Sequence, residues 1–413
     1  MRLLYSLGIY VYLFFIRVAA LFNHKAKLWI EGRKDWQKKL HAWRDKNPGT
    51  LYWFHCASLG EFEQGRPLIE AIRKENPAIK ILLTFFSPSG YEIRKNYDGA
   101  DLVCYLPADT PASANQFLDI IQPTSVFVVK YEYWANYFFA CQKRKIELFI
   151  VSGILRPDQR FFGAFSFFWK KVLQCVTHFF VQDQRTLELL HASNFHNATL
   201  TGDTRFDRVL MIADGAKEIA EIKAFKGESL CVVAGSSWDA DEKVLYDWWQ
   251  KVGSASHKLI IVPHEIHEQH LASVESRWPD AIRWTRRGDI DLTQKNVLIV
   301  DAIGFLSAIY RYADIAMIGG GFGAGIHNTL EAAVWGVPVV FGPRHEKFLE
   351  AQGLLACGGA YSGIDATELV KNLIELTENA GKRTESGKNA REFVAKNAGA
   401  TKLIMRSITH HNI

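Results

Sequence analysis

The densest group of residues suited to chemistry is a glycine-rich run late in the chain, where five of the seven residues 319–325 are glycine. The apolar residues 313–318 before it predict a buried parallel strand, and the residues after it predict a helix that ends near Gly336. Glycines let a backbone approach a ligand closely and expose amide N–H groups, and a helix N-terminus attracts phosphate. Glu331, about one turn into that helix, could reach a ribose hydroxyl pair. The run therefore predicts a nucleotide site.

Two other interpretations of this run stay open. Gly319-x-Gly321-x-x-Ala324 matches a degenerate dinucleotide fingerprint, although such fingerprints normally lie in the first strand–helix unit of a chain. A glycine-rich turn that serves only the packing of a strand against a helix would look the same.

A second candidate follows the first predicted strand, in residues 57–63. Gly60 permits a tight turn there, and Glu61 falls at a predicted helix start, where a carboxylate could act as a general base. An acidic residue in a first helical turn can equally serve only the helix dipole, and spacing alone leaves the two interpretations of Glu61 balanced. We assign Glu63 the plain dipole role.

Charged and aromatic residues follow the fourth predicted strand, in residues 130–136. Lys130, Glu132 and their aromatic neighbours suit the rim of a sugar-binding site, and a solvated ion pair at a helix start is the alternative. Where the first half of the chain passes into the second, Thr204 and Arg205 suit anion binding.

Polar loops also follow the first two predicted strands of the second half. Ser236 and Ser237 precede a predicted helix, so their hydroxyls and the following amides could bind phosphate. His264 is the better histidine candidate after the next strand, because residues 267–270 are predicted on a helix surface.

Two spacings could suggest a metal, and both have a plainer interpretation. Asp239-x-Asp241 resembles a metal-binding acidic pair, but it more simply caps and charges the first turn of a helix. His264-x-x-His267 could be half of a zinc site, but no third ligand is evident. We therefore predict no metal and no organic cofactor.

Short apolar runs alternate with helical patterns through most of the chain, which predicts parallel sheets covered on both faces. A first series ends near residue 181 and a second starts near residue 230, so we expect an α/β protein with two doubly wound, Rossmann-like domains facing each other across a cleft. Strands are predicted at 51–55, 79–84, 102–106, 125–129, 148–151, 178–181, 230–234, 259–262, 297–300, 315–318 and 337–341. Helices are predicted near 62–74, 88–97, 110–121 and 133–144.

The composition is that of a globular protein long enough for two domains, with 413 residues, 48% of them hydrophobic and 23% charged. A net charge of +5 is too small to argue for nucleic-acid binding. The six cysteines show no metal-binding spacing, which indicates reduced thiols in a cytosolic compartment.

The N-terminal residues 3–16 are apolar apart from tyrosines and one serine, and residues 18–22 extend the run past Arg17. About 20 such residues can span a hydrocarbon core, so we expect a membrane-anchoring or interfacial helix, with a buried core helix as the alternative. The basic flank follows the run, which argues against a cleaved signal peptide and places this flank in the cytoplasm. The flank consists of His24, Lys25, Lys27, Arg33, Lys34, Lys38, Lys39 and Arg44.

An aromatic cluster stands before Lys170 and Lys171 and has two possible roles. It could belong to the core, or it could form a membrane-facing ledge that guides a lipid. Its members are Phe161, Phe162, Phe165, Phe167, Phe168 and Trp169.

Taken together and in order, these motifs resemble the 3-deoxy-D-manno-octulosonic acid (Kdo) transferases of Gram-negative bacteria. The resemblance runs nearly end to end. Besides the apolar N-terminus, it rests on residues 53–61, 84–90, 106–111, 130–134, 202–207, 235–237 and 319–331.

The resemblance implies a GT-B fold and an inverting transfer of Kdo from CMP-Kdo to the 6′ hydroxyl of the lipid A precursor (lipid IVA) at the inner membrane, in lipopolysaccharide core biosynthesis. It implies that Glu61 is the catalytic base, that Glu132 supports the acceptor side and that Glu331 holds the CMP ribose. The expected substrate-binding residues are Ser58, Gly60, Lys130, Arg205, Ser236, Ser237, His264, Gly320, Gly321, Phe322, His327, Asn328 and Glu331.

The expected division of the chain is a membrane helix (1–24), an acceptor-binding domain (25–206), a linker (207–228) and a CMP-Kdo-binding domain (229–413). The expected partners are CMP-Kdo, lipid IVA and the membrane surface, with the catalytic domains on the cytoplasmic side and without nucleic acid.

Three positions depart from the family pattern. Ala135 stands where a proline is usual, residues 152–156 stand near a usual Asn-Ala-Arg, and the loop at His264 lacks a common arginine. Two rival functions remain: a GT-B enzyme that uses a UDP-sugar, and a non-catalytic, membrane-tethered binder of a sugar nucleotide.

Overall fold

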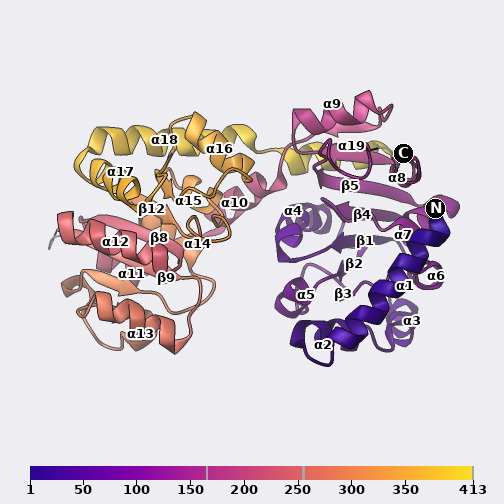
Figure 1. Ribbon diagram of the computed structural model, residues 1–413, viewed down its shortest axis with the longest axis horizontal. Coiled ribbons are helices and arrows are strands. Elements are labelled where there is room, and N and C mark those ends of the chain that lie inside the picture. Colours follow the sequence, from indigo (N-terminus) through magenta and orange to yellow (C-terminus); the bar gives the residue numbers. More distant parts are fainter. Residues whose placement is uncertain (164–165, 254–255, 412–413) are drawn as a thin grey trace. The chain divides into compact units, whose positions relative to one another are not determined.

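The computed structural model describes the chain except residues 164–165, 254–255 and 412–413. Two compact units form, each a parallel sheet with helices packed around it (Figure 1). Unit 1 comprises Met1–Arg208 and Ala398–Ile413, and unit 2 comprises Val209–Asn397. The chain thus returns to unit 1 at its end, where the Asp207 carboxylate accepts hydrogen bonds from the amides of Gly399 and Thr401.

Unit 1 contains seven parallel strands in the order β3-β2-β1-β4-β5-β6-β7. They are β1 (Leu51–Cys56), β2 (Lys80–Phe85), β3 (Leu102–Tyr105), β4 (Ser125–Val129), β5 (Glu147–Gly153), β6 (His178–Val181) and β7 (Ala198–Leu200). Its helices are α1 (Arg2–Ala19), α2 (His24–Glu31), α3 (Trp36–Lys46), α4 (Leu59–Glu75), α5 (Pro88–Arg94), α6 (Pro111–Ile121), α7 (Ala135–Lys143), α8 (Ser166–Leu173), α9 (Gln184–Ala192) and α19 (Ala400–His411).

The central strand β1 shows why this half folds as a two-sided sheet. All six of its residues are buried, because alternate side chains enter two separate cores. Tyr52 and Phe54 pack on one face with residues of α4 and α19, while Leu51 and Trp53 pack on the other with residues of α6 and α7. A continuous apolar run is therefore the expected signature of this strand.

Unit 2 repeats the architecture with the order β10-β11-β9-β8-β12-β13-β14. Its strands are β8 (Leu230–Ser237), β9 (His257–Pro263), β10 (Ile282–Arg283), β11 (Val297–Ile299), β12 (Ile315–Ile318), β13 (Val339–Phe341) and β14 (Ala360–Ser362). Its helices are α11 (Ala220–Lys226), α12 (Asp239–Val252), α13 (Glu268–Arg277), α14 (Leu306–Ile309), α15 (Leu330–Ala333), α16 (Leu349–Ala356), α17 (Ala366–Glu378) and α18 (Ala380–Asn397), and α10 (Thr204–Gly215) runs across the boundary of the units.

The prediction of two parallel α/β sheets is confirmed, and every predicted strand is present. Three short strands, β7, β10 and β14, were not predicted, because two or three residues carry too little pattern. The polar segment 207–228, expected as a linker, is largely helical. Ile222 and Phe225 of α11 anchor that segment, since both side chains are buried.

No long helix follows the glycine-rich run, so the prediction of a helix that extends from there to near Gly336 is wrong. Residues 319–329 form turns and irregular backbone, and the helix that follows, α15, has only four residues. So short a helix has little dipole to offer a phosphate, and Glu331 is its second residue.

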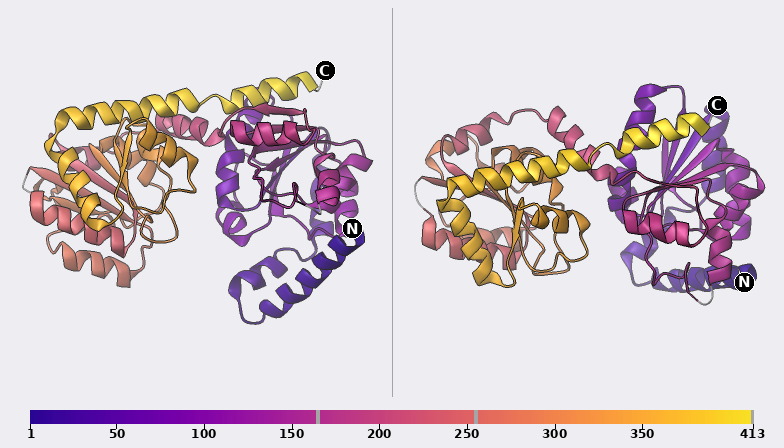
Figure 2. Two further views of the ribbon diagram at one scale, coloured as in Figure 1. Left: turned by 45° about the horizontal axis from the view of Figure 1, so that its top comes forward. Right: turned by 90° about the horizontal axis from the view of Figure 1, so that it is seen from above.

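Helix α1 is the one helix in the described part of the chain that is long and apolar enough to cross a membrane. One side of it packs on unit 1, with Ser6 and Leu13 buried, and it lies beside α2 (Figure 2). Apart from Arg2 and Arg17, most of its exposed surface is apolar: Leu3, Leu4, Leu7, Tyr10, Val11, Tyr12, Phe14, Phe15 and Val18.

Arg33 was predicted as part of the basic flank that follows this helix, but its side chain is engaged by internal contacts. Its guanidinium stacks on Trp29 at 3.6 Å and donates to the carbonyl oxygens of Leu106 and Phe86 at 2.7 and 2.8 Å. Arg33 is therefore a structural residue, whereas Lys25, Lys27, Lys34, Lys38 and Lys39 are exposed.

Candidate functional site

Strand order determines where ligands can bind in each unit. In unit 1 the order reverses between the neighbouring strands β1 and β4, and in unit 2 between β8 and β12. Open parallel sheets bind ligands outside the carboxyl ends of the strands at such a reversal. We call the loops 57–61 and 130–134 the unit 1 edge, and the loops 236–242 and 319–331 the unit 2 edge.

Glu61 lies at the unit 1 edge, in the first turn of α4. Its side chain is half-buried, and the Ser58 hydroxyl donates a hydrogen bond to its Oε2. Ser58 is the N-cap residue of α4, yet its side chain caps no helix amide. The Ser58 hydroxyl therefore orients the Glu61 carboxylate. A glutamate that served only the helix dipole would not need this hydrogen bond.

Glu132 lies on the other loop of this edge and is one-fifth exposed. Burial and, second, repulsion by Glu61 raise the pKa of Glu132 to about 7. Its Oε2 lies 4.0 Å from Nε2 of His55, a fully buried ring whose pKa burial lowers to about 3. The Trp134 indole donates to the same His55 Nε2 at 3.2 Å, so His55 is neutral and protonated on Nδ1, which donates to Thr84.

Cationic groups complete the unit 1 edge. Lys130 has a left-handed backbone (φ 69°), a strained conformation for a residue with a side chain and one that is common at functional sites. Burial raises the pKa of the neighbouring Tyr131 hydroxyl. The charge of Glu61 raises this pKa further, and the charges of Arg156 and Arg205 lower it. Arg205 is held by an ion pair with Asp203 at 2.6 Å. The structure therefore brings all the predicted unit 1 residues to one edge.

At the unit 2 edge the two predicted serines differ. Ser236 has a left-handed backbone (φ 53°) and is half-buried, which leaves it a candidate contact. Ser237 is buried, and its hydroxyl donates to the buried carboxylate of Glu242 at 3.0 Å. Glu242 in turn accepts from His270 at 2.9 Å, so His270 supports the loop rather than standing on an open helix surface as predicted.

Three rings pack together above this loop: the Trp238 indole donates to Nε2 of His327 at 3.2 Å, and the His264 ring stacks on both of these rings. His264 lies 4.7 Å from Trp238 and 4.4 Å from His327, with interplanar angles of 27° and 24°. Burial, with a further contribution from His264, lowers the pKa of His327 to about 4. The stack is neutral near pH 7 at His327 and presents flat aromatic surface beside the glycines.

Most amides of the glycine-rich run are used within the protein, contrary to the prediction that the run exposes them. The Gly320 amide donates to Asp241 at 2.9 Å, and the amides of Gly319, Gly323, Gly325 and His327 donate to carbonyl oxygens. In the described part of the chain, no protein oxygen accepts from the amides of Gly321 and Phe322. The amide of Ala324 likewise donates to no protein oxygen among the described residues, so these three are the donors of the run that are available to a ligand.

The glycines are also required for packing. A Cβ atom on Gly319 would lie 2.2 Å from the carbonyl oxygen of Ser236, and one on Gly321 would lie 2.6 Å from the amide nitrogen of Gly342. The run thus lets the β8, β12 and β13 loops touch each other through backbone, which agrees with the packing interpretation without excluding a ligand.

Both oxygens of Glu331 are held by neighbours. Asn328 Nδ2 donates to Oε1 at 3.0 Å, and the Ser307 hydroxyl donates to Oε2. Each carboxylate oxygen has a second lone pair, so the group can still accept from a ligand hydroxyl. Ser307 lies on the four-residue helix α14, which the sequence pattern did not reveal.

The sequence did not reveal the full roles of two supporting residues. His55 and Asp241 lie within quoted motifs, but partners far apart in sequence give them their roles. Asp241 behaves as the predicted capping residue of α12 by accepting from the Trp238 amide, and it additionally fixes Gly320. Among the described residues, no group of three or more His, Cys, Asp or Glu side chains surrounds His264 and His267.

The aromatic cluster is divided between the core and the surface. Phe161 and Phe168 are buried in the core, whereas Phe167 is exposed. Phe165 lies outside the described residues.

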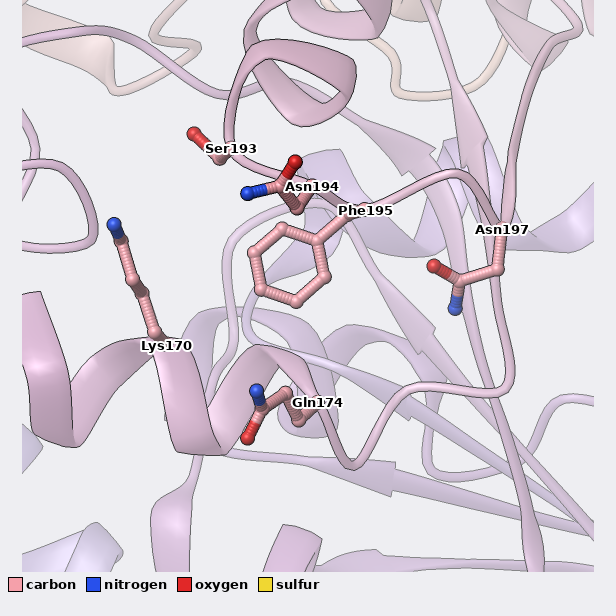
Figure 3. Close-up of a pocket in the computed structure, with 6 residues that line it drawn as sticks. All are labelled: Lys170, Gln174, Ser193, Asn194, Phe195 and Asn197. Atoms are coloured by element: carbon pink, nitrogen blue, oxygen red, sulfur yellow. The ribbon is translucent and has the colours of Figure 1, made fainter.

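A hollow of about 390 Å³ also opens on unit 1, but away from the candidate site (Figure 3). Its residues lie at the end of α8 and directly before β7, at the amino ends of the strands. The unit 1 edge lies at the carboxyl ends. The hollow is lined by Lys170, Gln174, Ser193, Asn194, Phe195 and Asn197.

Solved structures share the fold of the chain. UDP-GlcNAc 2-epimerase from Neisseria meningitidis superposes with a TM-score of 0.63, at 14% identity, over 87% of this chain and 99% of that one. MurG from Acinetobacter baumannii superposes with a TM-score of 0.55, at 15% identity, over 88% of this chain and 100% of that one. These likenesses confirm a GT-B-like pair of α/β units.

Sequence comparison points to one family. Residues 34–208 match the family described as 3-Deoxy-D-manno-octulosonic-acid transferase (kdotransferase). The 3-deoxy-D-manno-octulosonic acid transferase of Aquifex aeolicus is 28% identical over 80% of this chain and 87% of its own length. That of Chlamydia muridarum is 26% identical over 86% and 84%. Over most of its length the chain is therefore similar to the Kdo transferases, which are glycosyltransferases.

Proposed function

We propose that this chain transfers Kdo from CMP-Kdo to the 6′ hydroxyl of the lipid A precursor, lipid IVA, with inversion at the anomeric carbon, as a step of lipopolysaccharide core biosynthesis. The observation that carries the proposal is the oriented Glu61 carboxylate at the strand-order reversal of unit 1, in a chain similar to the Kdo transferases. A buried second carboxyl group, Glu132, shares that edge.

In the proposed step, Glu61 takes the proton of the acceptor hydroxyl while that oxygen bonds to the anomeric carbon of Kdo. The bond from this carbon to the CMP phosphate oxygen breaks, and CMP leaves with the electron pair. Ser58 keeps Glu61 aimed by its hydrogen bond. Glu132, Lys130 and Gly60 border the acceptor, and Arg205 adds positive charge for the leaving phosphate.

The donor side of the proposal uses the unit 2 edge. The free amides of Gly321 and Phe322 and the Ser236 hydroxyl suit phosphate oxygens. Glu331, held by Asn328, suits the ribose hydroxyls. The stacked rings of His264 and His327 suit the flat face of a base.

The proposal also places the protein on the cytoplasmic face of the inner membrane. Because one side of α1 packs on unit 1, the helix suits a position in the plane of the interface, with its exposed apolar side in the lipid. The exposed lysines of α2 and the following residues suit anionic headgroups. This arrangement would keep the unit 1 edge near a lipid acceptor.

The test is Glu61→Gln, measured by CMP release and by mass spectrometry of lipid products from CMP-Kdo and lipid IVA. We expect turnover to fall by on the order of 10²–10⁴, the usual contribution of a general base. Glu63→Gln is the matched control, because Glu63 lies on the same helix and pairs with Arg94 at 2.8 Å. Equal turnover in the two variants would remove Glu61 from its role.

Two further measurements distinguish the rival functions from the proposed one. A thermal shift with UDP but not with CMP would favour a UDP-sugar enzyme. CMP binding without any lipid product would indicate a binder that does not catalyse transfer.

A further inference from the structure

The start of α7 is capped by residues from other parts of the chain. Trp134 is its N-cap residue, but no side chain at that position caps the helix. Instead, the Asp109 carboxylate accepts from the amides of Asn136 and Tyr137 at 3.2 and 3.0 Å. The first helical amide, that of Ala135, donates to the Tyr5 hydroxyl at 3.4 Å.

Tyr5 therefore connects the membrane-suited helix to this cap. Its hydroxyl donates to Asp109 at 2.6 Å, so one α1 side chain joins both the capping carboxylate and the helix it caps. Ser6 and Arg2 add hydrogen bonds to Asn136 at 3.5 and 3.3 Å. Figure 1 shows the start of α1 beside α7.

The segment that enters α7 is the loop 130–134, which carries Glu132. Aromatic contacts hold this loop from a second side and also begin on α1. Ring centroids are separated by 6.2 Å between Tyr12 and Trp29, by 5.7 Å between Trp29 and Phe86, and by 4.9 Å between Phe86 and Trp134. The Trp134 indole then donates to His55, the ring beside Glu132.

We propose that α1 is more than a membrane attachment: its seating on unit 1 fixes the loop that carries Glu132, with Tyr5 and Asp109 as positioning residues. The consequence for turnover rests on the proposed Kdo transfer. The placement of the loop does not, and it can be measured without any substrate.

Ala135 gives the inference a sharp test. Proline at the first helical position has no amide hydrogen to satisfy and has a φ already suited to a helix. Trp134, with φ −80° and ψ 98°, has the extended backbone that a residue before proline prefers. A proline at this position would thus make the Tyr5 contact with residue 135 unnecessary.

The experiment compares Tyr5→Phe, Tyr5→Phe with Ala135→Pro, and Tyr10→Phe as a control on the exposed side of α1. The full chain is used, bound to vesicles of phosphatidylethanolamine and phosphatidylglycerol. We expect Tyr5→Phe to lower kcat about tenfold at unchanged KM for CMP-Kdo, because small misplacements of catalytic groups are costly. Ala135→Pro should restore most of the loss. A residue that only attaches α1 would not be rescued in this way.

The second readout is the ¹⁹F spectrum of protein labelled with 5-fluorotryptophan, in which the Trp134 resonance is assigned by Trp134→Phe. Tyr5→Phe should shift or broaden this resonance and Tyr10→Phe should not. Asp109→Asn, which loses one accepting oxygen, should act like Tyr5→Phe and replaces it if that variant does not fold. An unchanged Trp134 resonance, or a kcat loss that Ala135→Pro does not restore, would overturn the inference. If no variant and no wild-type protein transfers Kdo while the resonance moves as expected, the proposed function fails and the positioning role stands.

Discussion

The two edges have the same topology and offer a ligand different kinds of groups. Each lies where strand order reverses around the first strand of its sheet. The unit 1 edge presents side chains that can carry charge, Glu61, Glu132 and Lys130. The unit 2 edge presents backbone, in a run so crowded that a Cβ atom would not fit at Gly319.

This difference suits the two halves of the glycosyl transfer that we propose. Moving a proton requires an ionisable side chain held in one orientation, and Ser58 provides this for Glu61. Gripping a phosphate requires closely approaching donors, for which glycine backbone is suited. The acidic groups of the unit 2 edge, Asp241 and Glu331, are instead engaged by internal hydrogen bonds.

The largest expected effect comes from adding one methyl group at each edge. Gly319→Ala places Cβ 2.2 Å from a backbone oxygen, so we expect the free energy of unfolding to fall by about 3 kcal/mol or more. At Gly60 the nearest atom to a new Cβ is Ser58 Oγ at 3.8 Å. Gly60→Ala in the first turn of α4 should therefore be neutral or stabilising, by up to about 1 kcal/mol. Urea unfolding followed by circular dichroism checks the contrast, and equal losses would refute it.

The next effect concerns the carboxylate that braces the glycine run. Burial raises the pKa of Asp241 from near 3.8 to about 6, and its Oδ1 has no hydrogen-bond partner among the described residues. A raised pKa stabilises the folded protein at low pH, and this contribution is lost as pH rises from about 4 through 6. The loss is on the order of 2–3 kcal/mol, at 1.36 kcal/mol per pKa unit.

Asp241→Asn should flatten this pH dependence, and its single amide oxygen can keep both hydrogen bonds, because the amides of Trp238 and Gly320 donate to the same oxygen, Oδ2. The measurement is the difference in unfolding free energy between wild type and variant from pH 4 to pH 7. Asp239→Asn is the matched control, because Asp239 is exposed on the same helical turn and hydrogen bonds from Lys243 and Arg277 lower its pKa. A constant difference between wild type and Asp241→Asn would contradict the prediction.

The sequence predicted the sheets because continuous apolar runs such as 125–129 have one structural solution in a covered parallel sheet. It also predicted which loops lie together at the carboxyl ends of the strands, where the candidate site is, since parallel strands end at one edge of the sheet. It could not predict the length of the helix after the glycine-rich run. Turns that are held by hydrogen bonds between their own backbone groups leave no periodic pattern of apolar residues in the sequence. Nor could it predict the Tyr5–Asp109 and Ser307–Glu331 contacts, which depend on residues brought together only by folding.

The smallest effect tests whether the two carboxyl groups of the unit 1 edge sense each other. Burial and then repulsion by Glu61 raise the pKa of Glu132 from near 4.5 to about 7, so its stabilising contribution is lost as pH rises from about 4.5 through 7. Glu61→Gln removes the repulsion but not the burial, so the pKa of Glu132 should be less raised. The loss of stability with rising pH should then be complete at a lower pH. Glu132→Gln should abolish it.

Differential scanning calorimetry from pH 4 to pH 8 gives the melting temperature against pH for both variants, with Glu63→Gln as the control. Glu63 pairs with Arg94 and does not contribute to the shift at Glu132. If Glu61→Gln and Glu63→Gln give the same curve, the two edge carboxyls act independently, and Glu132 owes its raised pKa to burial alone. If the Glu61→Gln curve moves to lower pH, Glu61 and Glu132 are an electrostatically coupled pair at the unit 1 edge.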